Sequence, residues 1–462
     1  MTNVNESNVS ASTSDKASEW VDKHGDYTLV PVPKKYSKRL LTLAFIYMSM
    51  VADIAEIWGG GIIGSQFNVR DALFVCFVGS FILACLGGAL AYIGGVTRCS
   101  SYVNFRSAFG VLGSKIFSTI ASTVPNIGWF AILAWLFGVI MHSILPDVAL
   151  CGVLPATIWG GLLMVITAYF GFKGLAVFSY LAVPFFIMLA AFGLLIGVHG
   201  SGGFSDLFEL TPAGSASYGE GITMVVGMMM ALCLITADVC RFGKSRWSGV
   251  AAWSFAMALQ VVLLVGAAML TLFTGESDVP GALMAAGVGL GAFVMVLLGQ
   301  WSTNDTNLYS SSLAVSMYVP LKRKYVVLII GAIGVTVAAL IASVWGRAMD
   351  PLEAFLGIMG TVLPGVAGVV IADFYIYQAY RKVKMDDRYK MSPGSKLPVI
   401  NWLGWLSAIV ATIVGGFVMS GGIPALNTLF IGLGCYALGS IICDKLGIST
   451  GIGVHTLKET GE

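Results

Sequence analysis

Charged side chains are scarce in this sequence. Only 11% of the 462 residues are Asp, Glu, Lys or Arg, and 57% are hydrophobic, whereas a soluble domain carries about 25% charged residues. The mean hydropathy is +0.86. Because so few charges are present, we expect a polytopic membrane protein and not a soluble domain.

Signatures of catalysis, metal binding and nucleic-acid binding are also missing. The sequence has no GxxxxGK[ST] loop, no HExxH motif and no Ser-His-Asp arrangement, and its four histidines lie in loops, in tails or at the ends of apolar runs. The eight cysteines form no CxxC pair, so neither a disulfide framework nor a zinc site is indicated. A net charge of +2 gives no hint of nucleic-acid binding. We therefore expect neither an enzyme nor a resident cofactor.

Apolar runs long enough to cross a membrane follow one another along the chain. A helix needs about 20 residues to cross a hydrocarbon core about 30 Å thick, and we count twelve such runs. They cover residues 40–62, 72–96, 117–141, 152–171, 174–198, 221–239, 248–274, 283–318, 325–345, 352–378, 401–419 and 424–443. The first run is too long for a signal peptide and follows a polar tail, so we expect the N-terminus to be retained.

The distribution of Lys and Arg sets the expected orientation, because positive charges near span ends stay on the cytoplasmic side. If the loops between the runs alternate between the two sides, only Arg70 and Arg347 of the 26 Lys and Arg residues fall outside. We therefore expect a multi-pass plasma-membrane protein, in the inner membrane if the source is bacterial, with both termini in the cytoplasm.

The run at 283–318 is interrupted at its middle by the polar stretch 299–305. Hydrocarbon cannot hydrogen-bond these side chains, so they must face protein, an ion or a water-filled cavity. The hydroxyls of Ser302 and Thr303, with carbonyls of a locally distorted backbone, are hard oxygen ligands that suit Na⁺. Asn304 supplies a donor and an acceptor, which suits an amide-like or heterocyclic ligand. Polar contacts between helices remain an alternative explanation.

Two carboxylates, Asp53 and Glu56, interrupt the first run near its middle. A buried acidic group is costly in a bilayer, so we expect it only where it is paired, protonated or in a polar cavity. Asp53 is a candidate for substrate recognition, whereas pairing with a buried donor is a simpler explanation for Glu56. The glycines at 59–61 let the helix unwind or let another helix approach closely.

The third and sixth runs also carry unusual residues at their midpoints. Asn126 and Trp129 follow Pro125 in the third run, and a proline kinks a helix. Tryptophan prefers the membrane interfaces, so Trp129 either packs in the core or stacks on a ligand. In the sixth run, Gly227 precedes the methionines 228–230, and we interpret this glycine as a weak point of the helix. The flexible segment around it is either core or ligand site.

Charged residues gather at the cytoplasmic ends of the sixth and tenth runs. Asp238 and Arg241 are three residues apart, so they can pair on one face of a helix. Asp373 is expected at the same side of the membrane, at the end of the tenth run. We interpret the three residues as a gating network that closes the cytoplasmic side.

The order of the runs predicts internal symmetry. The first five runs begin in the cytoplasm and the next five begin outside, so the two sets are candidates for an inverted repeat with two helices appended. Interrupted helices at matching positions of two repeats point to a binding site at the membrane midplane. We expect a disordered tail, two repeats, a cytoplasmic linker, two further helices and a second tail. These segments cover residues 1–33, 34–200, 201–380, 381–400, 401–445 and 446–462.

Short motifs carry a family resemblance. They are Thr236-Ala237-Asp238 with Arg241-Phe242-Gly243, Trp301-Ser302-Thr303-Asn304-Asp305 with Leu308-Tyr309, Gly128-Trp129-Phe130, and Val369-Val370-Ile371-Ala372-Asp373. Over residues 30–440 the chain resembles the purine-cytosine permease (cytosine permease-like) branch of the nucleobase:cation symporter family. The resemblance implies a LeuT-type fold, so the expected fold class is an all-α polytopic membrane protein with twelve transmembrane helices, a 5+5 inverted repeat plus two C-terminal helices.

The resemblance also assigns residues to two sites. The cation site would use the carbonyls of Ser49, Ala52 and Gly299 and the hydroxyls of Ser302 and Thr303. The substrate site would involve Asn126, Trp129, Met228, Met229, Ala231 and Asn304, to which we add Asp53. Met229 stands where the cytosine branch has an aromatic residue, and Asp53 stands where that branch has a phenylalanine. Both departures argue against cytosine itself as the substrate.

The expected function follows from these assignments. We expect a symporter that imports a nucleobase or a related small nitrogen heterocycle with Na⁺, or with H⁺, by alternating access. A cation-coupled carrier of a small amine or guanidino compound is the alternative within transport. A membrane sensor that binds its ligand without moving it is the alternative from another class. The expected partners are the small-molecule substrate, the coupling ion and the lipid bilayer.

Overall fold

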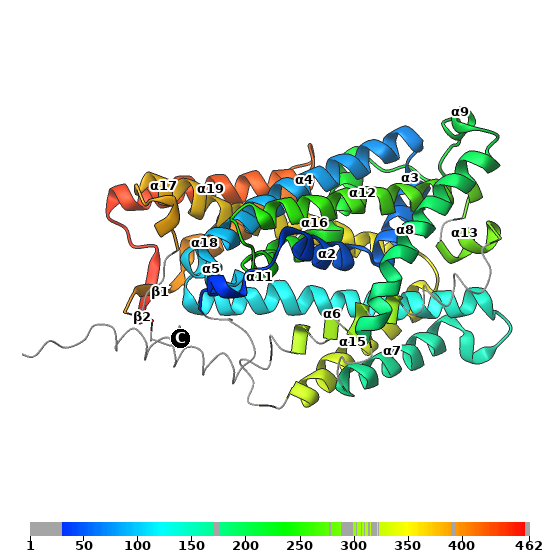
Figure 1. Ribbon diagram of the computed structural model, residues 1–462, viewed down its shortest axis with the longest axis horizontal. Coiled ribbons are helices and arrows are strands. Elements are labelled where there is room, and N and C mark those ends of the chain that lie inside the picture. Colours follow the sequence, from blue (N-terminus) through cyan, green and yellow to red (C-terminus); the bar gives the residue numbers. More distant parts are fainter. Residues whose placement is uncertain are drawn as a thin grey trace, which may run out of the picture.

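Most helices of the computed structural model run along its longest axis (Figure 1). The structure describes residues 30–170, 175–276, 279–287, 299–301, 303–305, 307–308, 310–312, 315, 321, 323–389 and 394–457. These residues are mostly helical, as the sequence predicts.

The α-helices are α2 (Leu40–Val51), α3 (Ile54–Gln66), α4 (Val69–Thr97), α5 (Ser101–Phe109), α6 (Val111–Ile144), α7 (Val153–Phe170), α8 (Leu175–Gly200), α9 (Phe204–Leu207), α10 (Tyr218–Leu234), α11 (Ala237–Cys240), α12 (Ser248–Thr274), α13 (Val279–Ala285), α15 (Arg323–Trp345), α16 (Asp350–Ile371), α17 (Gln378–Tyr380), α18 (Trp402–Val410) and α19 (Pro424–Leu446). Two π-helical segments, η4 (Ala372–Tyr377) and η6 (Ala411–Val418), continue α16 and α18. The short 3-10 helices are η1 (Lys34–Tyr36), η2 (Ala149–Cys151) and η5 (Met385–Asp387).

Six of the described helices are long and apolar enough to cross a membrane, and the number is seven if the bent pair α2–α3 forms one span. Shorter apolar helices coincide with further predicted runs, at Val153–Tyr169, Pro184–Gly200, Tyr218–Leu234 and Trp402–Val418. The run at 283–318 lies mostly outside the described residues. A multi-pass membrane fold is therefore supported, and the number of twelve transmembrane helices stays a prediction.

The helices pack into two groups. In one group α12 packs against α3, α4 and α8, and α10 packs against α3 and α4; in the other, α6, α7 and α15 pack on one another. Figure 1 shows the second group along one side of the molecule. The first group holds the predicted runs 1, 2, 5, 6 and 7, and the second holds runs 3, 4 and 9. Runs at matching positions of the two proposed repeats therefore lie together, runs 1 and 6 and runs 2 and 7 in the first group and runs 4 and 9 in the second. This grouping fits an inverted repeat, which itself stays a prediction.

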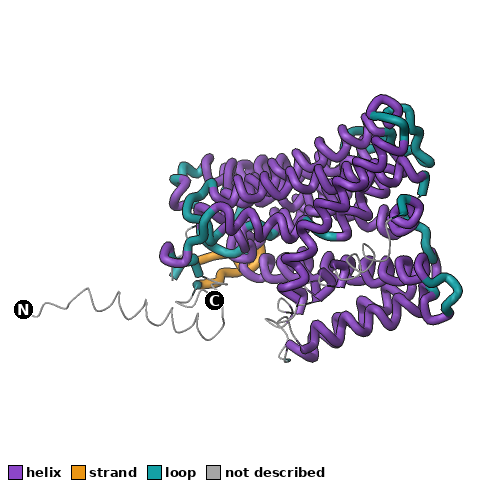
Figure 2. Tube along the Cα trace, turned by 45° about the vertical axis from the view of Figure 1, so that its right-hand side comes forward, coloured by secondary structure: helices purple, strands orange, loops and turns teal. Residues whose placement is uncertain are grey.

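Two short strands form a feature that the sequence analysis did not anticipate. Strand β1 (Lys396–Asn401) pairs antiparallel with β2 (Gly451–Thr456), with Leu397 opposite His455 and Ile400 opposite Ile452. Figure 2 shows the pair at one end of the helical bundle. The predicted linker at 381–400 and the predicted tail at 446–462 are thus joined. Both strands are only six residues long and about fifty residues apart, so the sequence of either one alone is a weak indication of a β-strand.

Two glycines allow α10 and α16 to cross at backbone contact. A Cβ at Gly227 would clash with the backbone of Leu356, and a Cβ at Gly360 would clash with the backbone of Thr223. Gly227 lies inside the continuous helix α10. Our interpretation of Gly227 as the weak point of the sixth run is therefore wrong, because this glycine allows close packing and does not interrupt its helix.

Candidate functional site

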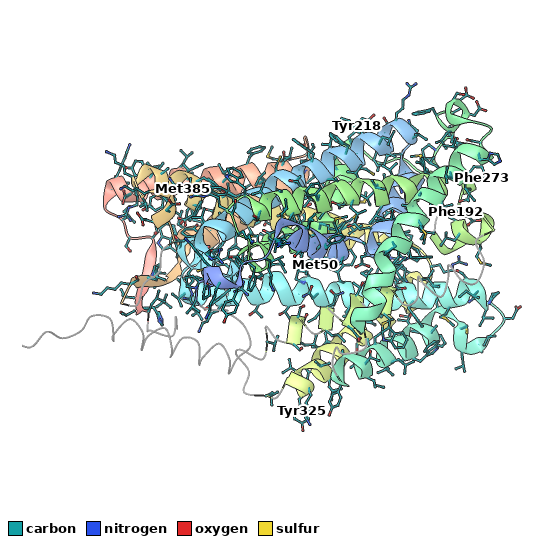
Figure 3. The ribbon with its side chains drawn as sticks, viewed as in Figure 1. Met50, Phe192, Tyr218, Phe273, Tyr325 and Met385 are labelled. Atoms are coloured by element: carbon teal, nitrogen blue, oxygen red, sulfur yellow. The ribbon has the colours of Figure 1, made fainter. Side chains whose placement is uncertain are left out.

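The first predicted run is broken between α2 and α3, which are bent by 57°. Ala52, at φ −72° and ψ 75°, forms an inverse γ-turn, in which the Asp53 N–H donates to the Val51 carbonyl at 2.8 Å. In an uninterrupted helix that N–H would bond to the Ser49 carbonyl. Figure 3 shows Met50, next to the break, midway between Met385 at one end of the molecule and Phe273 at the other. The break therefore lies near the middle of the bundle and turns the Ser49 carbonyl away from the helical ladder.

Asp53 caps the second half of the broken helix. Its carboxylate accepts a hydrogen bond from the Ala55 N–H at 3.2 Å and also lies close to the Thr303 hydroxyl. The residue is only 9% exposed. Asp53 thus connects the break in the first run to the polar stretch of the eighth.

The glycines at 59–61 do not unwind their helix. All three lie inside α3, and a Cβ at Gly60 would clash with the backbone of Leu264 in α12. We proposed two explanations for these glycines. The structure supports the second, which is the close approach of another helix.

The predicted cation ligands come from two segments that the structure brings together. Ser49 precedes the turn that Ala52 forms, and Asp53, directly after this turn, lies close to Thr303. Thr303 in turn donates to the Gly299 carbonyl at 3.1 Å. Ser302 lies outside the described residues. Among the described residues no group of three or more His, Cys, Asp or Glu side chains could hold a metal ion. The candidate site is therefore built from carbonyl and hydroxyl oxygens, which are ligands for a hard cation.

Trp129 lies in α6, and Asn304 contacts the backbone of α6 next to it. The Asn304 amide donates to the Phe130 carbonyl at 3.1 Å, directly after Trp129. Trp129 packs edge-to-face against Phe355 of α16, with ring centroids 5.0 Å apart. Asn126 is half-buried and lies about one turn before Trp129. The bond from Asn304 matches the predicted polar contact between helices, and Trp129 is the residue directly before the carbonyl that Asn304 binds.

The methionine segment of α10 covers α3. The end of the Met228 side chain occupies the space that a Cβ at Gly59 would need. Met228 and Met229 are both buried, whereas Ala231 is half-buried. In this conformation Met228 is a packing residue, and Ala231 is the more accessible of the three.

The sixth run is also broken, but at a different place from the one we predicted. Helix α10 ends at Leu234, and α11 begins at Ala237. The Ile235 N–H donates to the Leu232 carbonyl at 3.2 Å, and the Tyr47 hydroxyl donates to the Thr236 carbonyl at 2.6 Å. Tyr47 was not among the predicted site residues, because its contact with Thr236 joins α2 to a distant part of the chain.

The predicted gating residues make separate sets of contacts. Asp238 accepts a hydrogen bond from the Ser101 N–H at 2.8 Å, and the Arg241 guanidinium donates to the Asp238 carbonyl at 3.1 Å. These contacts tie α11 to the beginning of α5.

Asp373 is instead held by two tyrosines. Its carboxylate accepts hydrogen bonds from Tyr389 at 2.6 Å and from Tyr436 at 2.9 Å, and the residue is 1% exposed. Burial and the adjacent Asp373 carboxylate raise the pKa of Tyr389 well above its ordinary value. Asp373 therefore joins α16 to the linker and to α19, two partners that the sequence analysis did not identify.

A small cavity lies between the end of α3 and the beginnings of α4 and α10. A space of about 330 Å³ is lined by polar and aromatic side chains, among them Gln66, Asp71 and Tyr218. The Tyr218 hydroxyl donates to Asp71 at 2.6 Å. Nearby, the capping box of Ser217 and Glu220 begins α10, and hydrogen bonds from Ser217 lower the pKa of Glu220.

Known proteins share both the sequence pattern and the fold. The cytosine permease of Escherichia coli strain K12 is 29% identical over 409 residues, which are 87% of this chain and 92% of the permease. The hydantoin permease of Microbacterium maritypicum is 23% identical over 391 residues, covering 78% of this chain and 77% of the permease. The solved inward-facing conformation of Mhp1 has a TM-score of 0.74 at 18% identity, over 90% of this chain and 93% of that one.

A match to a family model shows the family to which this chain belongs. The model for permeases for cytosine/purines, uracil, thiamine and allantoin matches residues 30–442. This match confirms the resemblance drawn from the motifs. The chain therefore belongs to that permease family, and is a multi-pass membrane transporter and not an enzyme.

Proposed function

We propose that this transporter imports a nucleobase or a related small nitrogen heterocycle together with Na⁺ by alternating access. The observation that carries the proposal is the break between α2 and α3, where Asp53 reaches Thr303. Family membership and the names of the cytosine and hydantoin permeases support a heterocycle as the substrate class.

The substrate would bind between an aromatic surface and hydrogen-bonding groups. Trp129 offers its indole face, and Asn304 offers both a donor and an acceptor once it exchanges its bond to the Phe130 carbonyl. Asp53 offers two acceptor oxygens at the break. A planar ring with several N–H groups meets all three requirements.

Na⁺ would bind where the broken helix meets the eighth run. The carbonyls of Ser49, Ala52 and Gly299, with the hydroxyls of Ser302 and Thr303, form a set of hard oxygen ligands. The inverse γ-turn at Ala52 supports this assignment, because it frees the Ser49 carbonyl from the hydrogen bonds of the helix. A cation there would link α2 and α3 to the eighth run and so couple ion binding to helix position.

Alternating access would use the bend between α2 and α3 as a hinge. The likeness to an inward-facing structure supports a state that is open toward the cytoplasm. Closure of that side would rearrange Asp238 and Arg241 at α11 and Asp373 at the end of α16. Both helix breaks would then change together during transport.

A small amine or guanidino compound is the second candidate substrate. The feature that favours it is the Asp53 carboxylate at mid-depth, since a carboxylate can neutralise a cationic ligand. The buried Met228 and Met229 provide soft, apolar surroundings and no second aromatic face.

Uptake into proteoliposomes tests the proposed function. Purified protein would be reconstituted and offered labelled nucleobases, hydantoins, amines and guanidino compounds under an inward Na⁺ gradient, a pH gradient or no gradient. We expect accumulation of one heterocycle above equilibrium only with the Na⁺ gradient. Accumulation of an amine instead supports the second candidate. Tight binding with no uptake under any gradient contradicts transport and supports the sensor.

A further inference from the structure

A second carboxylate, Glu56, lies one turn beyond Asp53 in α3 and is fully buried, at 0% exposure. Its Oε1 accepts a hydrogen bond from the side-chain amide of Gln260 in α12 at 3.5 Å, and Gln260 is also 0% exposed. Its Oε2 has no hydrogen-bond partner among the described residues. Glu56 is thus held by one long hydrogen bond from a neutral group.

The groups that face Glu56 cannot neutralise a negative charge. Asp53 on the same helix is itself acidic, and Cys76 of α4 faces Glu56 with a thiol. From α10 the Val225 carbonyl accepts a hydrogen bond from the same Gln260 amide at 3.5 Å. Among the described residues, no Lys, Arg or His acts on Glu56. An ionised carboxylate here would carry a large, uncompensated desolvation cost.

Gln260 also has a buried oxygen without a hydrogen-bond partner. Its Oε1, like Oε2 of Glu56, has no hydrogen-bond donor among the described residues. A carboxylic acid and a primary amide can form two reciprocal hydrogen bonds, since each then has one donor and one acceptor. The bond from the amide to the acid is present. Only the donor on the acid is missing, and a proton on Glu56 supplies it.

We propose that Glu56 binds a proton and that the Glu56–Gln260 pair is a proton-binding site which fastens α3 to α12. No bond other than the O–H bond forms, and the proton comes from water. With the proton bound, Oε2 of Glu56 can donate a hydrogen bond and Oε1 of Gln260 can accept it. Without it, the ionised carboxylate requires water, so α3 must separate from α12 to admit it.

The site lies on the second half of the broken helix. Helix α3 packs against both α10 and α12, so a change at Glu56 alters the element that Asp53 caps. Binding of a proton therefore favours the conformation described here over one in which Glu56 is hydrated. The link between this proton and substrate movement rests on the proposed function, whereas occupancy of the site does not.

Thermal unfolding of the purified protein at several pH values, at constant Na⁺, tests the site. The folded state holds a proton that an unfolded chain releases above its ordinary carboxyl range, so wild-type stability should fall as pH rises. The folding equilibrium should change by up to about tenfold per pH unit for one proton. Glu56→Gln, which stays neutral, should lose this component. Asp386→Asn, a surface acid paired with Arg246 at 3.0 Å, is the matched control and should keep it.

Infrared spectroscopy gives a second readout that does not depend on how Glu56→Gln folds. At neutral pH the wild type should show a carbonyl band of a protonated carboxylic acid, and Gln260→Leu should shift that band to higher frequency because the acid loses its amide partner. A wild type with no such band overturns the proposal. Equal pH dependence in the wild type and Glu56→Gln also overturns it. So does an effect of Glu56→Gln on Na⁺-dependent stability alone, because a metal cation then occupies the site. Neither readout requires transport.

Discussion

The two broken helices of this transporter satisfy the backbone groups at their breaks in different ways. At the first break the N-terminus of α3 is capped by the side chain of Asp53, which also reaches Thr303 on another run. At the second break, after Leu234, the carbonyls are satisfied by local turns and by the Tyr47 hydroxyl. At the first break the Asp53 carboxylate is therefore a charged group that can exchange its partners for a ligand. The second break is closed by its own backbone, which suits a hinge better than a binding site.

The electrostatics of the two breaks reinforce this difference. The N-terminus of a helix carries partial positive charge and its C-terminus partial negative charge. Asp53 offsets the positive end of α3, whereas no described Lys or Arg lies in the last turn of α10. The central region is therefore suited to a ligand rich in N–H donors or positive charge, and to a cation.

Asp53→Asn should have the largest effect on ligand binding. Asparagine caps a helix about as well as aspartate, so the change keeps the cap of α3 and removes only the charge. We expect affinity for the native ligand to fall by about 2–5 kcal/mol, as measured by isothermal titration, with little change in thermal stability. Asp71→Asn, in the cavity beside Gln66 and Tyr218, is the matched control. An unchanged ligand profile would mean that Asp53 is a helix cap and nothing more.

Gly227→Ala distinguishes the two explanations of the second broken helix. If Gly227 were a flexible point, alanine would stabilise α10. Because a Cβ there clashes with the backbone of Leu356, we expect instead a loss of about 1–3 kcal/mol in thermal stability. Gly434→Ala in α19, where a Cβ meets nothing within 4 Å, should gain up to about 1 kcal/mol. A stabilising Gly227→Ala would restore the flexible-point explanation.

Thr303→Ala tests whether the cation joins the first break to the eighth run. Loss of the hydroxyl should raise the half-saturating Na⁺ concentration for uptake, at a cost of about 1–3 kcal/mol in cation binding. Thr336→Ala on α15 removes a hydroxyl that bonds only within its own helix, to the Ala332 carbonyl at 2.8 Å, and should leave Na⁺ dependence unchanged. Wild-type uptake that ignores Na⁺ and follows a pH gradient would count against the assignment.

Tyr47→Phe should have the smallest effect and bears on the second break alone. It removes the hydrogen bond to the Thr236 carbonyl, which we expect to lower stability by about 0.5–1.5 kcal/mol. Because Tyr47 fastens α2 to the hinge, uptake rate should change more than ligand affinity. Tyr375→Phe removes a similar bond, to the Ala89 carbonyl at 2.9 Å, and should alter stability but not rate. Equal rates in both variants would argue against a hinge at Thr236.

The sequence predicted the first break better than the second for a physical reason. A carboxylate in the middle of an apolar run is costly wherever the chain folds, so Asp53 marks its break locally. Gly227 is different, because its use depends on Gly360, which lies far away in the chain. Glycine permits both unwinding and close approach, and only the partner helix decides between them.

The other misses have the same origin. Gln260 lies in a long apolar run, and its hydrogen bond to Glu56 depends on how α12 packs against α3, which the sequence alone does not show. Likewise, Tyr389 and Tyr436 come from the linker and the last helix, so their contact with Asp373 depends on the tertiary fold. Positions of single polar groups could be predicted from composition and run length, whereas their partners could not.

An experimental structure with ligand is the most direct test of the central claim, which is that the first break holds the recognition site. The compound that most raises the melting temperature in a screen of nucleobases, hydantoins, amines and guanidino compounds would be used for it. We predict density within hydrogen-bonding distance of the Asp53 carboxylate and against the Trp129 ring. Density confined to the cavity beside Gln66 and Tyr218, with Asp53 still bonded to the Ala55 N–H, would contradict the claim.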